Sequence, residues 1–436
     1  MKQTPIDKNI VEQVLADNKI SDFNNATIRQ VVKVANDIEK ASGVEFIHME
    51  MGVPGLTPPA VGIAAEKAAL DSGAAAIYPA IDGIPELKTE AARFIKAFID
   101  VDVNPQGCVP TTGSMQGSYA AFMLCGQIDP KKDTILFIDP GFSVQKTQLK
   151  VMGYRSENFD VYEYRGEKLR EKLESYFSTG RISAVIYSNP NNPAWICLTE
   201  SELKIIGELA DKYDVIVLED LAYLAMDTRR KMNTPFEAPF QPTVAKYCKN
   251  WIMMISGSKI FSYAGQRIAT VAISDSLYNR RYDALAERYG MGEFGRTFIY
   301  MILYTLTSGV THTAQYALAA MFKAASDGTL DFINDTAEYG RRAQKLKKIF
   351  QDHGFTITYD KDLDELVSDG FYFTISYPGL TSGELMKELA SYGVSAISLT
   401  TCGSTQHGLR ACTSNIKEHQ YAILDERMKI FAENHK

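Results

Sequence analysis

The chain has 436 residues, of which 45% are hydrophobic and 23% are charged. This composition is ordinary for a globular protein, and the length is sufficient for two or three domains with large cores. A formal net charge of −7, without any block of Lys or Arg, argues against nucleic acid and against anionic membranes as partners.

The N-terminal residues and the cysteines both predict a cytoplasmic protein. Residues 1–5 have neither an apolar core nor a small-residue cleavage pattern, so we expect no signal peptide. The six cysteines are scattered without a C-x-x-C pair, which is typical of free thiols in a reducing compartment. An apolar stretch begins at residue 299, but threonines, Ser308, Gly309 and His312 interrupt it. We interpret this stretch as a buried helix rather than a membrane span.

In chain order, an amphipathic helical pattern over the first fifty residues precedes a series of short apolar runs. These runs lie at residues 134–138, 183–187, 215–219, 251–255 and 268–273. Helical patterns separate them, for example at residues 200–213. Strands that alternate with amphipathic helices predict an α/β fold, with a mostly parallel sheet between two layers of helices.

The pattern changes after residue 313 and predicts a smaller α/β unit. Residues 314–351 carry apolar side chains at helical spacing, which indicates one or two long helices. Short strands are then expected at residues 356–358, 371–375 and 394–397. We find no internal repeat and no low-complexity linker.

Polar residues follow two of the apolar runs in the larger unit. Asp220 and Tyr223 come after the run at 215–219, and Lys259 comes after the run at 251–255. In open α/β sheets, ligands bind beyond the carboxyl ends of the strands. We therefore expect these three side chains to face one crevice.

The segment that contains Lys259 combines two chemistries. Ser256, Ser258 and Arg267 offer hydroxyl donors and a guanidinium, which suit a phosphate dianion. Lysine is the side chain that forms a Schiff base with an aldehyde. Pyridoxal 5'-phosphate (PLP) carries both a phosphate and an aldehyde, so this segment predicts a PLP site. The alternative is a polar turn with an exposed lysine.

The segment at 220–223 fits the same cofactor. A carboxylate such as Asp220 can hydrogen-bond the protonated pyridine nitrogen of PLP and keep the ring electron-poor. Tyr223 would donate to the phenolic oxygen. An aspartate at a strand end is otherwise most often a helix N-cap, and this is the alternative interpretation of Asp220.

With these motifs in order, the sequence resembles the class I/II aminotransferases, which are fold-type I PLP-dependent enzymes. The resemblance runs from about residue 45 to about residue 415. It implies a large PLP-binding domain over residues 51–313 and a C-terminal small domain over 314–436. Residues 1–50 would form an N-terminal arm and part of the small domain.

The resemblance also assigns further residues to the site. Gly113, Ser114 and Met115 match the turn whose backbone amides hold the cofactor phosphate at a helix N-terminus, a role that orphan N–H groups and the helix dipole explain. The other implied members are Phe142, stacked on the pyridine ring; Asn192, bonded to the phenolic oxygen and near the substrate; Tyr78, on the phosphate of a neighbouring subunit; Gly52, beside the substrate carboxylate; and Arg410, paired with that carboxylate.

Substrate preference is less clearly encoded. The family usually continues after Asn192-Pro193 with Thr-Gly, whereas this chain has Ala194 and Trp195. Trp195, Phe261 and Tyr263 suggest an apolar or aromatic side-chain pocket. Arg296 lies where some members place an arginine for a side-chain carboxylate, but a surface arginine is the favoured interpretation.

We therefore expect an aminotransferase that moves an amino group between an L-amino acid and a 2-oxo acid by a ping-pong course. Lys259 would be the Schiff-base lysine and the base, with Asp220 and Tyr223 as catalytic partners. The first alternative is a PLP-dependent carbon–sulfur lyase or a related elimination enzyme.

Two further classes are less consistent with the sequence. A DNA-binding regulator on the same fold would need a basic helix-turn-helix region, and the first fifty residues are too short for it. A nucleotide-binding oxidoreductase would need a G-x-G-x-x-G motif that the chain lacks. The family normally shares sites across a dimer, so we expect a homodimer.

Overall fold

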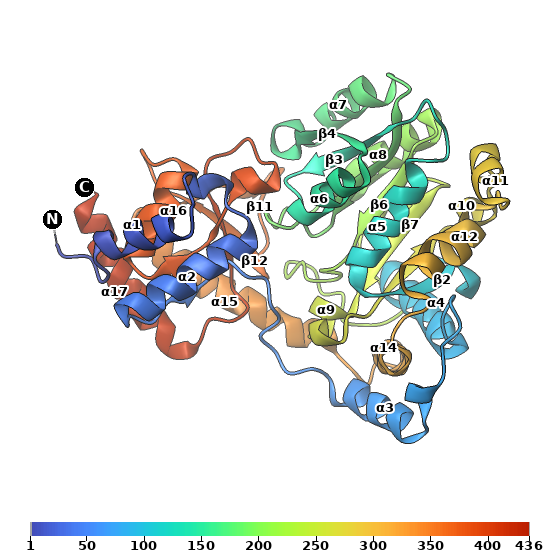
Figure 1. Cartoon of the computed structure of the whole chain (residues 1–436), viewed down its shortest axis with the longest axis horizontal. Helices are drawn as coiled ribbons and strands as arrows, with labels where there is room; N and C mark the ends of the chain where they lie inside the picture. Colours follow the sequence, from blue (N-terminus) through green and yellow to red (C-terminus); the bar gives the residue numbers. More distant parts are fainter. Residues whose placement is uncertain (1, 436) are drawn as a thin grey trace.

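The computed structural model describes residues 2–435, and it shows two bodies side by side (Figure 1). The larger body contains a sheet between helices. The smaller one contains both described ends of the chain. The long helix α15 (Phe332–Asp352) runs from the smaller body toward the larger one.

The larger body is organised around a seven-stranded sheet. Five of its strands, from β7 to β4, are parallel to one another, whereas β8 runs antiparallel to both of its neighbours. In spatial order the strands are β2 (Cys108–Thr111), β8 (Ala269–Ile273), β7 (Trp251–Ser256), β6 (Ile216–Asp220), β5 (Ile182–Ser188), β3 (Thr134–Asp139) and β4 (Arg155–Asp160).

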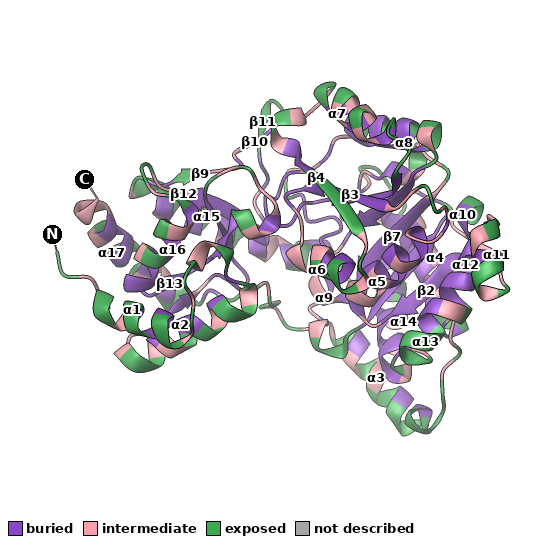
Figure 2. Cartoon of the chain, turned by 45° about the horizontal axis from the view of Figure 1, so that its top comes forward, coloured by how far each residue is buried: buried purple, intermediate pink, exposed green. Residues whose placement is uncertain are grey.

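The central strands are continuous apolar runs because helices cover both faces of the sheet. Along β3, Ile135 and Phe137 face one core, while Leu136 and Ile138 face the other. Figure 2 shows this sheet as the buried centre of the larger body. The edge strand β4 is mostly exposed and polar, as an edge strand must be to avoid pairing with other chains.

Two layers of helices sandwich the sheet. One core includes residues of α4, α7, α8 and α14, and the other includes residues of α5, α6, α10, α11, α12 and η7. The helices of this body are α3 (Ala60–Asp71), α4 (Pro85–Ile99), α5 (Gly113–Cys125), α6 (Ser143–Met152), α7 (Lys168–Phe177), α8 (Glu200–Tyr213), α9 (Gly257–Ile260), α10 (Asp275–Asn279), α11 (Asp283–Tyr289), α12 (Phe294–Thr297), η7 (Phe298–Leu303), α13 (Tyr304–Thr307) and α14 (His312–Ser326).

Short 3-10 turns connect several of these elements. In the larger body they are η2 (Ala74–Ala76), η3 (Pro105–Gly107), η4 (Val161–Tyr164), η5 (Val244–Lys246) and η6 (Ala264–Gln266), and in the smaller body η1 (Phe23–Asn25) and η8 (Leu399–Cys402).

The smaller body has its own sheet and its own apolar cores. Its antiparallel sheet has the order β14 (Ile397–Ser398), β15 (Leu409–Cys412), β12 (Tyr372–Ser376) and β9 (Thr356–Ile357), and β1 (Ile47–His48) pairs with β13 (Val394–Ser395). In addition to α15, this body contains the helices α1 (Lys8–Asp17), α2 (Ile28–Ser42), α16 (Ser382–Ser391) and α17 (Glu418–Asn434).

Local sequence fixes where several helices begin. A threonine stands at the N-cap and a Gln or Glu three residues later in α2, α8 and α16, and in each case both bonds of a capping box form. The two bonds satisfy N–H groups that the first turn of a helix leaves without partners.

A short hairpin, β10 (Lys361–Asp362) with β11 (Glu365–Leu366), extends from the smaller body to the larger one. Figure 2 shows it near α7. Among residues 2–435, no helix is both long and apolar enough to cross a membrane.

The predicted α/β fold with a mostly parallel, helix-covered sheet is confirmed, and the five apolar runs form β3, β5, β6, β7 and β8. The domain boundaries at residues 50 and 313 stay a prediction. Ala314, Leu318 and Met321 of α14 belong to the larger core, because this helix packs against α3 and α4. We therefore propose that the second boundary lies after α14.

Candidate active site

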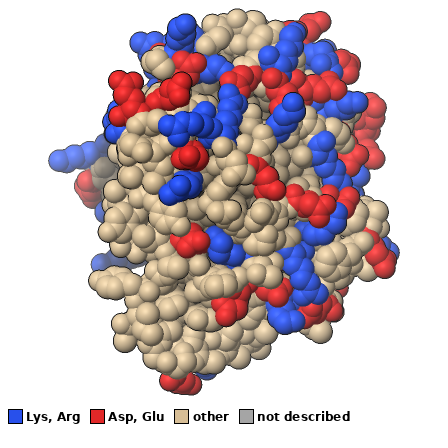
Figure 3. All heavy atoms as spheres, turned by 90° about the vertical axis from the view of Figure 1, so that its right-hand side faces the viewer, with Lys and Arg blue, Asp and Glu red and all other residues tan. Residues whose placement is uncertain are grey.

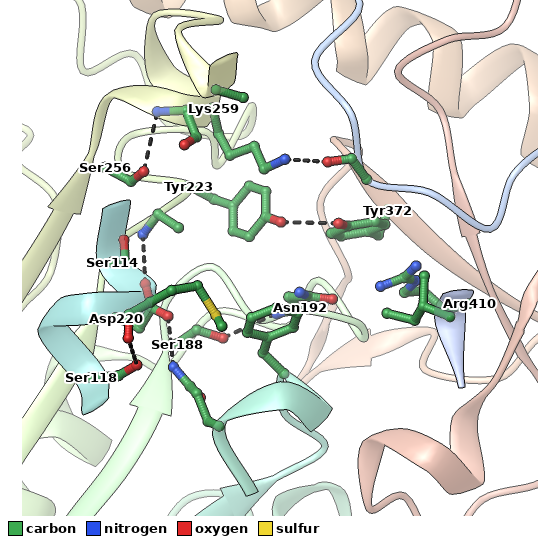
Figure 4. A pocket seen from close by; sticks show the side chains of 18 of the residues that line it. Ser114, Ser118, Ser188, Asn192, Asp220, Tyr223, Ser256, Lys259, Tyr372 and Arg410 are labelled. Atoms are coloured by element: carbon green, nitrogen blue, oxygen red, sulfur yellow. Dashed lines mark hydrogen bonds between the residues drawn. The ribbon is translucent and has the colours of Figure 1, made fainter. Parts of the chain in front are cut away.

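A cavity of about 220 Å³ opens beyond the carboxyl ends of β5, β6 and β7. Residues of both bodies line it, and Figure 4 shows the labelled ones converging on one space. The lining consists of Ile28, Gly52, Ser114, Met115, Ser118, Phe142, Gln145, Ser188, Asn192, Asp220, Ala222, Tyr223, Ser256, Ser258, Lys259, Ala264, Arg267, Tyr372 and Arg410.

Lys259 reaches this cavity from α9, directly after β7. Its amine donates to the backbone carbonyl of Gly52 and lies 5.0 Å from the centre of the Phe371 ring. Burial lowers the pKa of Lys259 to about 8, and the guanidinium groups of Arg410 and Arg267 contribute in the same direction. A neutral, nucleophilic amine is therefore accessible near neutral pH.

Asp220 occupies the last position of β6 and is nearly inaccessible to solvent. Its carboxylate accepts hydrogen bonds of 3.1 Å from the side chain of Gln145 and from the backbone N–H of Ala222. Burial raises the pKa of Asp220 to about 6, although these two bonds favour the ionised form. No side-chain cation neutralises this carboxylate within hydrogen-bonding distance among residues 2–435.

Tyr223 follows β6 in the next turn, and its hydroxyl donates to the hydroxyl of Tyr372 at 3.1 Å. Burial raises the pKa of Tyr223 well above its ordinary value, so this phenol stays protonated. Trp195 packs behind it, with the two ring centres 5.3 Å apart.

One end of the cavity has the features of an anion site. Helix α5 begins at Gly113 without a side-chain cap, so the first N–H groups of the helix are available to a ligand. The Ser114 hydroxyl is buried and has no partner within the described part of the chain. Ser256 and Ser258 lie nearby, with the Ser256 hydroxyl accepting a 3.1 Å bond from the Ser258 N–H.

Gly113 and Arg267 fit closely together at this end. Gly113 has φ +67°, and a Cβ built there would lie 2.6 Å from Nη2 of Arg267, so no other residue is accommodated without displacing the guanidinium. Arg267 is anchored by a 2.8 Å bond from Nη1 to the carbonyl oxygen of Ala264. Arg267 also lines the cavity.

At the opposite end, Arg410 lies on β15 and is only 2% exposed. One terminal nitrogen donates to the backbone carbonyl of Glu50, whereas the Nε atom has no partner among the described residues. The ring of Tyr372 covers the guanidinium, whose carbon lies 4.7 Å from the ring centre. A buried arginine with an unused donor is suited to a carboxylate.

Asn192 and Phe142 complete the lining between the two ends. The backbone N–H of Asn192 donates to the Ser188 hydroxyl at 3.1 Å, and the Asn192 side-chain oxygen is buried with no partner in residues 2–435. Phe142 and Met115 add apolar surface to the same cavity.

Some predicted residues lie elsewhere. Tyr78 is 89% exposed, so its predicted contact with a neighbouring subunit stays a prediction. Arg296 is an exposed residue of α12 and does not line the cavity.

The expected apolar pocket of Trp195, Phe261 and Tyr263 is corrected by the structure. Trp195 is fully buried behind Tyr223, and Phe261 packs among core phenylalanines. The hydroxyl of Tyr263 bonds to Glu66 instead of facing the cavity. Core packing accounts for all three aromatic side chains.

Sequence reasoning missed Gln145, Ile28 and Tyr372. Gln145 comes from α6 and Ile28 from α2, and neither belongs to a motif. Tyr372 was interpreted only as part of a strand. In the register of β12 with β15, Tyr372 lies opposite Cys412 and is therefore the diagonal neighbour of Arg410.

The residues present fit PLP. An uncapped helix start, Gly113 and Arg267 form a cradle for a phosphate, and Ser114 and Asn192 carry buried polar atoms that have no partner among residues 2–435. Both residues line the cavity, where a bound ligand could satisfy these atoms. No group of three or more His, Cys, Asp or Glu residues within 2–435 could hold a metal ion.

Comparison with known proteins agrees with this site. Residues 45–427 match the family described as aminotransferase class I and II. Because the match covers most of the sequence, the chain belongs to this family. Its members use PLP, the cofactor that the residues of this cavity fit.

Individual relatives are distant. The chain is 26% identical over 268 residues to an aspartate aminotransferase of Sulfolobus acidocaldarius. This alignment covers 59% of this chain and 62% of the relative. It is 27% identical over 235 residues to an asparagine–oxo-acid transaminase of Streptococcus mutans, covering 52% and 56%. The alignments thus span about 60% of the length of these relatives.

Solved structures share the fold over nearly the whole chain. An aminotransferase from Mycobacterium tuberculosis superposes with a TM-score of 0.75 at 19% identity, covering 93% of this chain and 96% of that one. An alanine aminotransferase from Pyrococcus furiosus gives a TM-score of 0.72 at 18% identity, with coverage of 96% and 99%.

Proposed function

We propose that this chain is a PLP-dependent aminotransferase that moves an amino group between an L-amino acid and a 2-oxo acid. One observation carries the proposal: the amine of Lys259, with its pKa lowered to about 8 by burial, shares a cavity with the guanidinium of Arg410, whose Nε has no partner among residues 2–435. An amine for a cofactor aldehyde and a cation for a substrate carboxylate are thereby brought to one space.

When bound, the cofactor supplies an electron-poor ring that accepts electrons from the substrate's α-carbon. Lys259 would hold its aldehyde carbon. Asp220 would keep a proton on the ring nitrogen, and the positive charge placed there would compensate this otherwise unpaired carboxylate. Tyr223 and Asn192 would bond the phenolic oxygen.

The phosphate of the cofactor would lie at the start of α5. The N–H groups after Gly113, the hydroxyls of Ser114, Ser256 and Ser258, and the Arg267 guanidinium together offer the neutral and charged donors that a dianion requires. Phe142 would pack on the pyridine ring, with Met115 beside it. These contacts would hold the ring between Asp220 and Lys259, which line the same cavity.

The substrate would be held by its carboxylate between Arg410 and the Gly52 segment. Lys259 is then the base that takes the α-proton, because its lowered pKa leaves a substantial neutral fraction near pH 8. The same amine can return the proton on the cofactor side. The reverse course with a second 2-oxo acid would complete a ping-pong cycle.

The surface is consistent with the proposed homodimer. Exposed apolar side chains occur on three adjacent segments, with Leu70 in α3, Ile77 and Tyr78 after η2, and Tyr304 and Leu306 in α13. His312, at the start of α14, contacts the segment around η2, since its Nδ1 lies 3.1 Å from the carbonyl oxygens of Ala74 and Ile77. Tyr78 would then reach the site of the neighbouring subunit.

On the face shown in Figure 3, Lys and Arg are interspersed with Asp and Glu, which does not favour a nucleic-acid surface. All six cysteines are free, which supports the proposal of a cytoplasmic protein.

The proposed activity is tested with PLP-loaded protein and a panel of amino acids paired with 2-oxo acids. Lys259→Ala should lower the rate of amino transfer at least about 1,000-fold, because both the covalent attachment and the base are lost. Lys348→Ala is the matched control, since Lys348 is an exposed lysine on α15. The rate is followed by the formation of the new amino acid.

Two outcomes would contradict the proposal. Unchanged amino transfer in Lys259→Ala would remove this lysine from the chemistry. Release of ammonia and pyruvate from a cysteine conjugate, without amino transfer to any 2-oxo acid, would identify a carbon–sulfur lyase instead.

A further inference from the structure

Tyr372 lies at the centre of the cavity, between the residues proposed for the cofactor and those proposed for the substrate. It enters from β12 of the smaller body and is 2% exposed. Its hydroxyl faces that of Tyr223, and its ring covers Arg410 (Figure 4). One side chain therefore contacts both ends of the proposed reaction site.

The position of the Tyr372 hydroxyl is tightly defined. A Cβ built on Gly52 would lie 1.9 Å from the hydroxyl oxygen, so the backbone at Gly52 passes directly against it. Ring packing against Phe371 and Tyr223, with centres 5.1 and 5.6 Å away, fixes the phenol from the other sides. The same Gly52 accepts the hydrogen bond from Lys259 through its carbonyl oxygen, so the hydroxyl packs against the segment that contacts the lysine.

The two facing hydroxyls carry two protons but form one hydrogen bond. Tyr223 donates and Tyr372 accepts at 3.1 Å. Among residues 2–435, no acceptor is found for the proton of Tyr372. If Tyr223 donates its proton elsewhere, Tyr372 can reverse the bond and donate to the Tyr223 oxygen.

The proposed function places such an acceptor beside Tyr223, namely the phenolic oxygen of the cofactor. We propose that Tyr372 is a positioning residue that donates to Tyr223, strengthens the hydrogen bond from Tyr223 to the cofactor, and at the same time holds the Arg410 guanidinium with its ring. Hydrogen bonds in a chain polarise one another, so the first donor strengthens the second. This inference rests on the proposed function.

Removing the hydroxyl of Tyr372 and removing its ring should have different measurable effects. A donor at the phenolic oxygen disperses negative charge and makes the bound cofactor less basic. Loss of the Tyr372 hydroxyl therefore raises the pH at which the visible absorbance of the bound cofactor changes. Loss of the ring instead removes the aromatic face that stabilises the Arg410 cation. The guanidinium is then held less firmly, so carboxylate binding is weakened.

The experiment compares the pH midpoint of cofactor absorbance in wild type, Tyr372→Phe, Tyr223→Phe and the double variant. Tyr372→Phe should raise the midpoint by about 0.5 to 1 in pH, the effect of one net hydrogen bond. Tyr223→Phe should raise it further, and adding Tyr372→Phe to that variant should change nothing more. Such non-additivity is expected only if Tyr372 acts through Tyr223.

The ring is tested with propanoate, a carboxylate that cannot react. Tyr372→Leu should weaken propanoate binding about 2- to 5-fold, whereas Tyr372→Phe should leave it unchanged. Tyr372→Leu also serves the midpoint measurement if Tyr372→Phe does not fold. The control is Tyr392→Phe, which removes a fully buried hydroxyl bonded to Asn434, far from this cavity.

Three results would overturn the inference. These are an unchanged midpoint in Tyr372→Phe with cofactor bound, an additive double variant, or an equal shift in Tyr392→Phe. A wild-type chain that shows no cofactor absorbance at all would instead overturn the proposed function.

Discussion

Two buried groups of charged residues in this protein differ in whether their polar atoms are paired. One is the cavity around Lys259, and the other surrounds Asp362 on the hairpin β10–β11. The second group, here named the Asp362 cluster, consists of Asp362, Arg165, Arg229, Glu202 and Asp227.

The Asp362 cluster satisfies its own charges. Asp362 accepts from Arg165 at 2.7 Å, from Arg229 at 2.8 Å and from the backbone N–H of Cys197 at 2.8 Å. Arg165 also forms a bidentate pair with Glu202, at 2.7 and 2.9 Å. Because these charges are paired across the two bodies, we interpret the cluster as the connection between the hairpin and the larger body.

The cavity has the opposite character. Lys259 contacts no carboxylate, Asp220 bonds no cation, and polar atoms of Ser114, Asn192 and Arg410 have no partner among residues 2–435. Burying charge without compensation is unfavourable. The difference is therefore one of place: polar atoms of Ser114, Asn192 and Arg410 that lack partners among residues 2–435 meet in one cavity, whereas the charges of the Asp362 cluster are paired with one another.

The largest expected effect follows from removing the centre of the paired cluster. Asp362→Ala removes the hydrogen bonds from Arg165, Arg229 and the Cys197 N–H, although each arginine keeps a second carboxylate, and the loss of these bonds should lower the free energy of unfolding by about 3 to 5 kcal/mol. Urea unfolding of the cofactor-free protein measures the loss. Asp364→Ala, an exposed aspartate of the same hairpin, is the control and should stay within about 0.5 kcal/mol. A loss for Asp362→Ala as small as that of the control would show that the cluster does not stabilise the fold.

The second prediction concerns Lys259 and has the opposite sign. Lys259→Met should raise the free energy of unfolding of the cofactor-free protein by about 2 to 3 kcal/mol at pH 7, because it removes a buried ammonium. The folded-state pKa of about 8 lies below that of the unfolded chain. Wild-type stability should therefore rise as the pH increases from about 8 to 10, and the advantage of the variant should shrink over this range.

The measurement is urea unfolding at a series of pH values, with Lys348→Met as the control at an exposed lysine. A destabilised Lys259→Met protein at pH 7 would contradict the prediction and indicate that the ammonium is compensated.

The smallest expected effect is at Asp220. The folded-state pKa of Asp220, about 6, lies above that of an aspartate in the unfolded chain. The folded protein therefore favours the protonated carboxyl group, and wild-type stability should fall as the pH rises from about 4 to 6. At pH 7, Asp220→Asn should stabilise the cofactor-free protein by about 2 kcal/mol. Thermal unfolding at pH 4 and pH 7, compared with Asp364→Asn, checks this. Equal effects at the two pH values would contradict it.

Much of the larger body could be predicted from the sequence, because strands covered by helices on both faces are continuous apolar runs. Strands such as β6 and β7 were therefore recognisable. The edge strand β4, with its exposed sequence Arg155–Asp160, gives no such signal and was missed. Strand β2 also gives no clear signal, because it is only four residues long and pairs with β8, which lies far along the chain.

The candidate site could be predicted only where its residues form local motifs. Asp220 and Lys259 follow strands directly, so the rule for open α/β sheets placed them together. Tyr372 and Gln145 approach from a strand of the other body and from a helix, and their neighbours in sequence carry no chemistry. Trp195 shows the reverse error, because an aromatic residue next to a motif residue turned out to be core.

The sequence by itself determined the class of fold, the family and the segments that carry the lysine, the aspartate and the arginine, because these depend on periodicity and on short motifs. The tertiary structure alone decided which polar atoms remain unpaired and which charges neutralise one another. Pairing depends on the distance between side chains far apart in the chain, as for Tyr372 and Tyr223 or Asp362 and Arg165. Such distances are set when the two bodies pack together, and no local pattern encodes them.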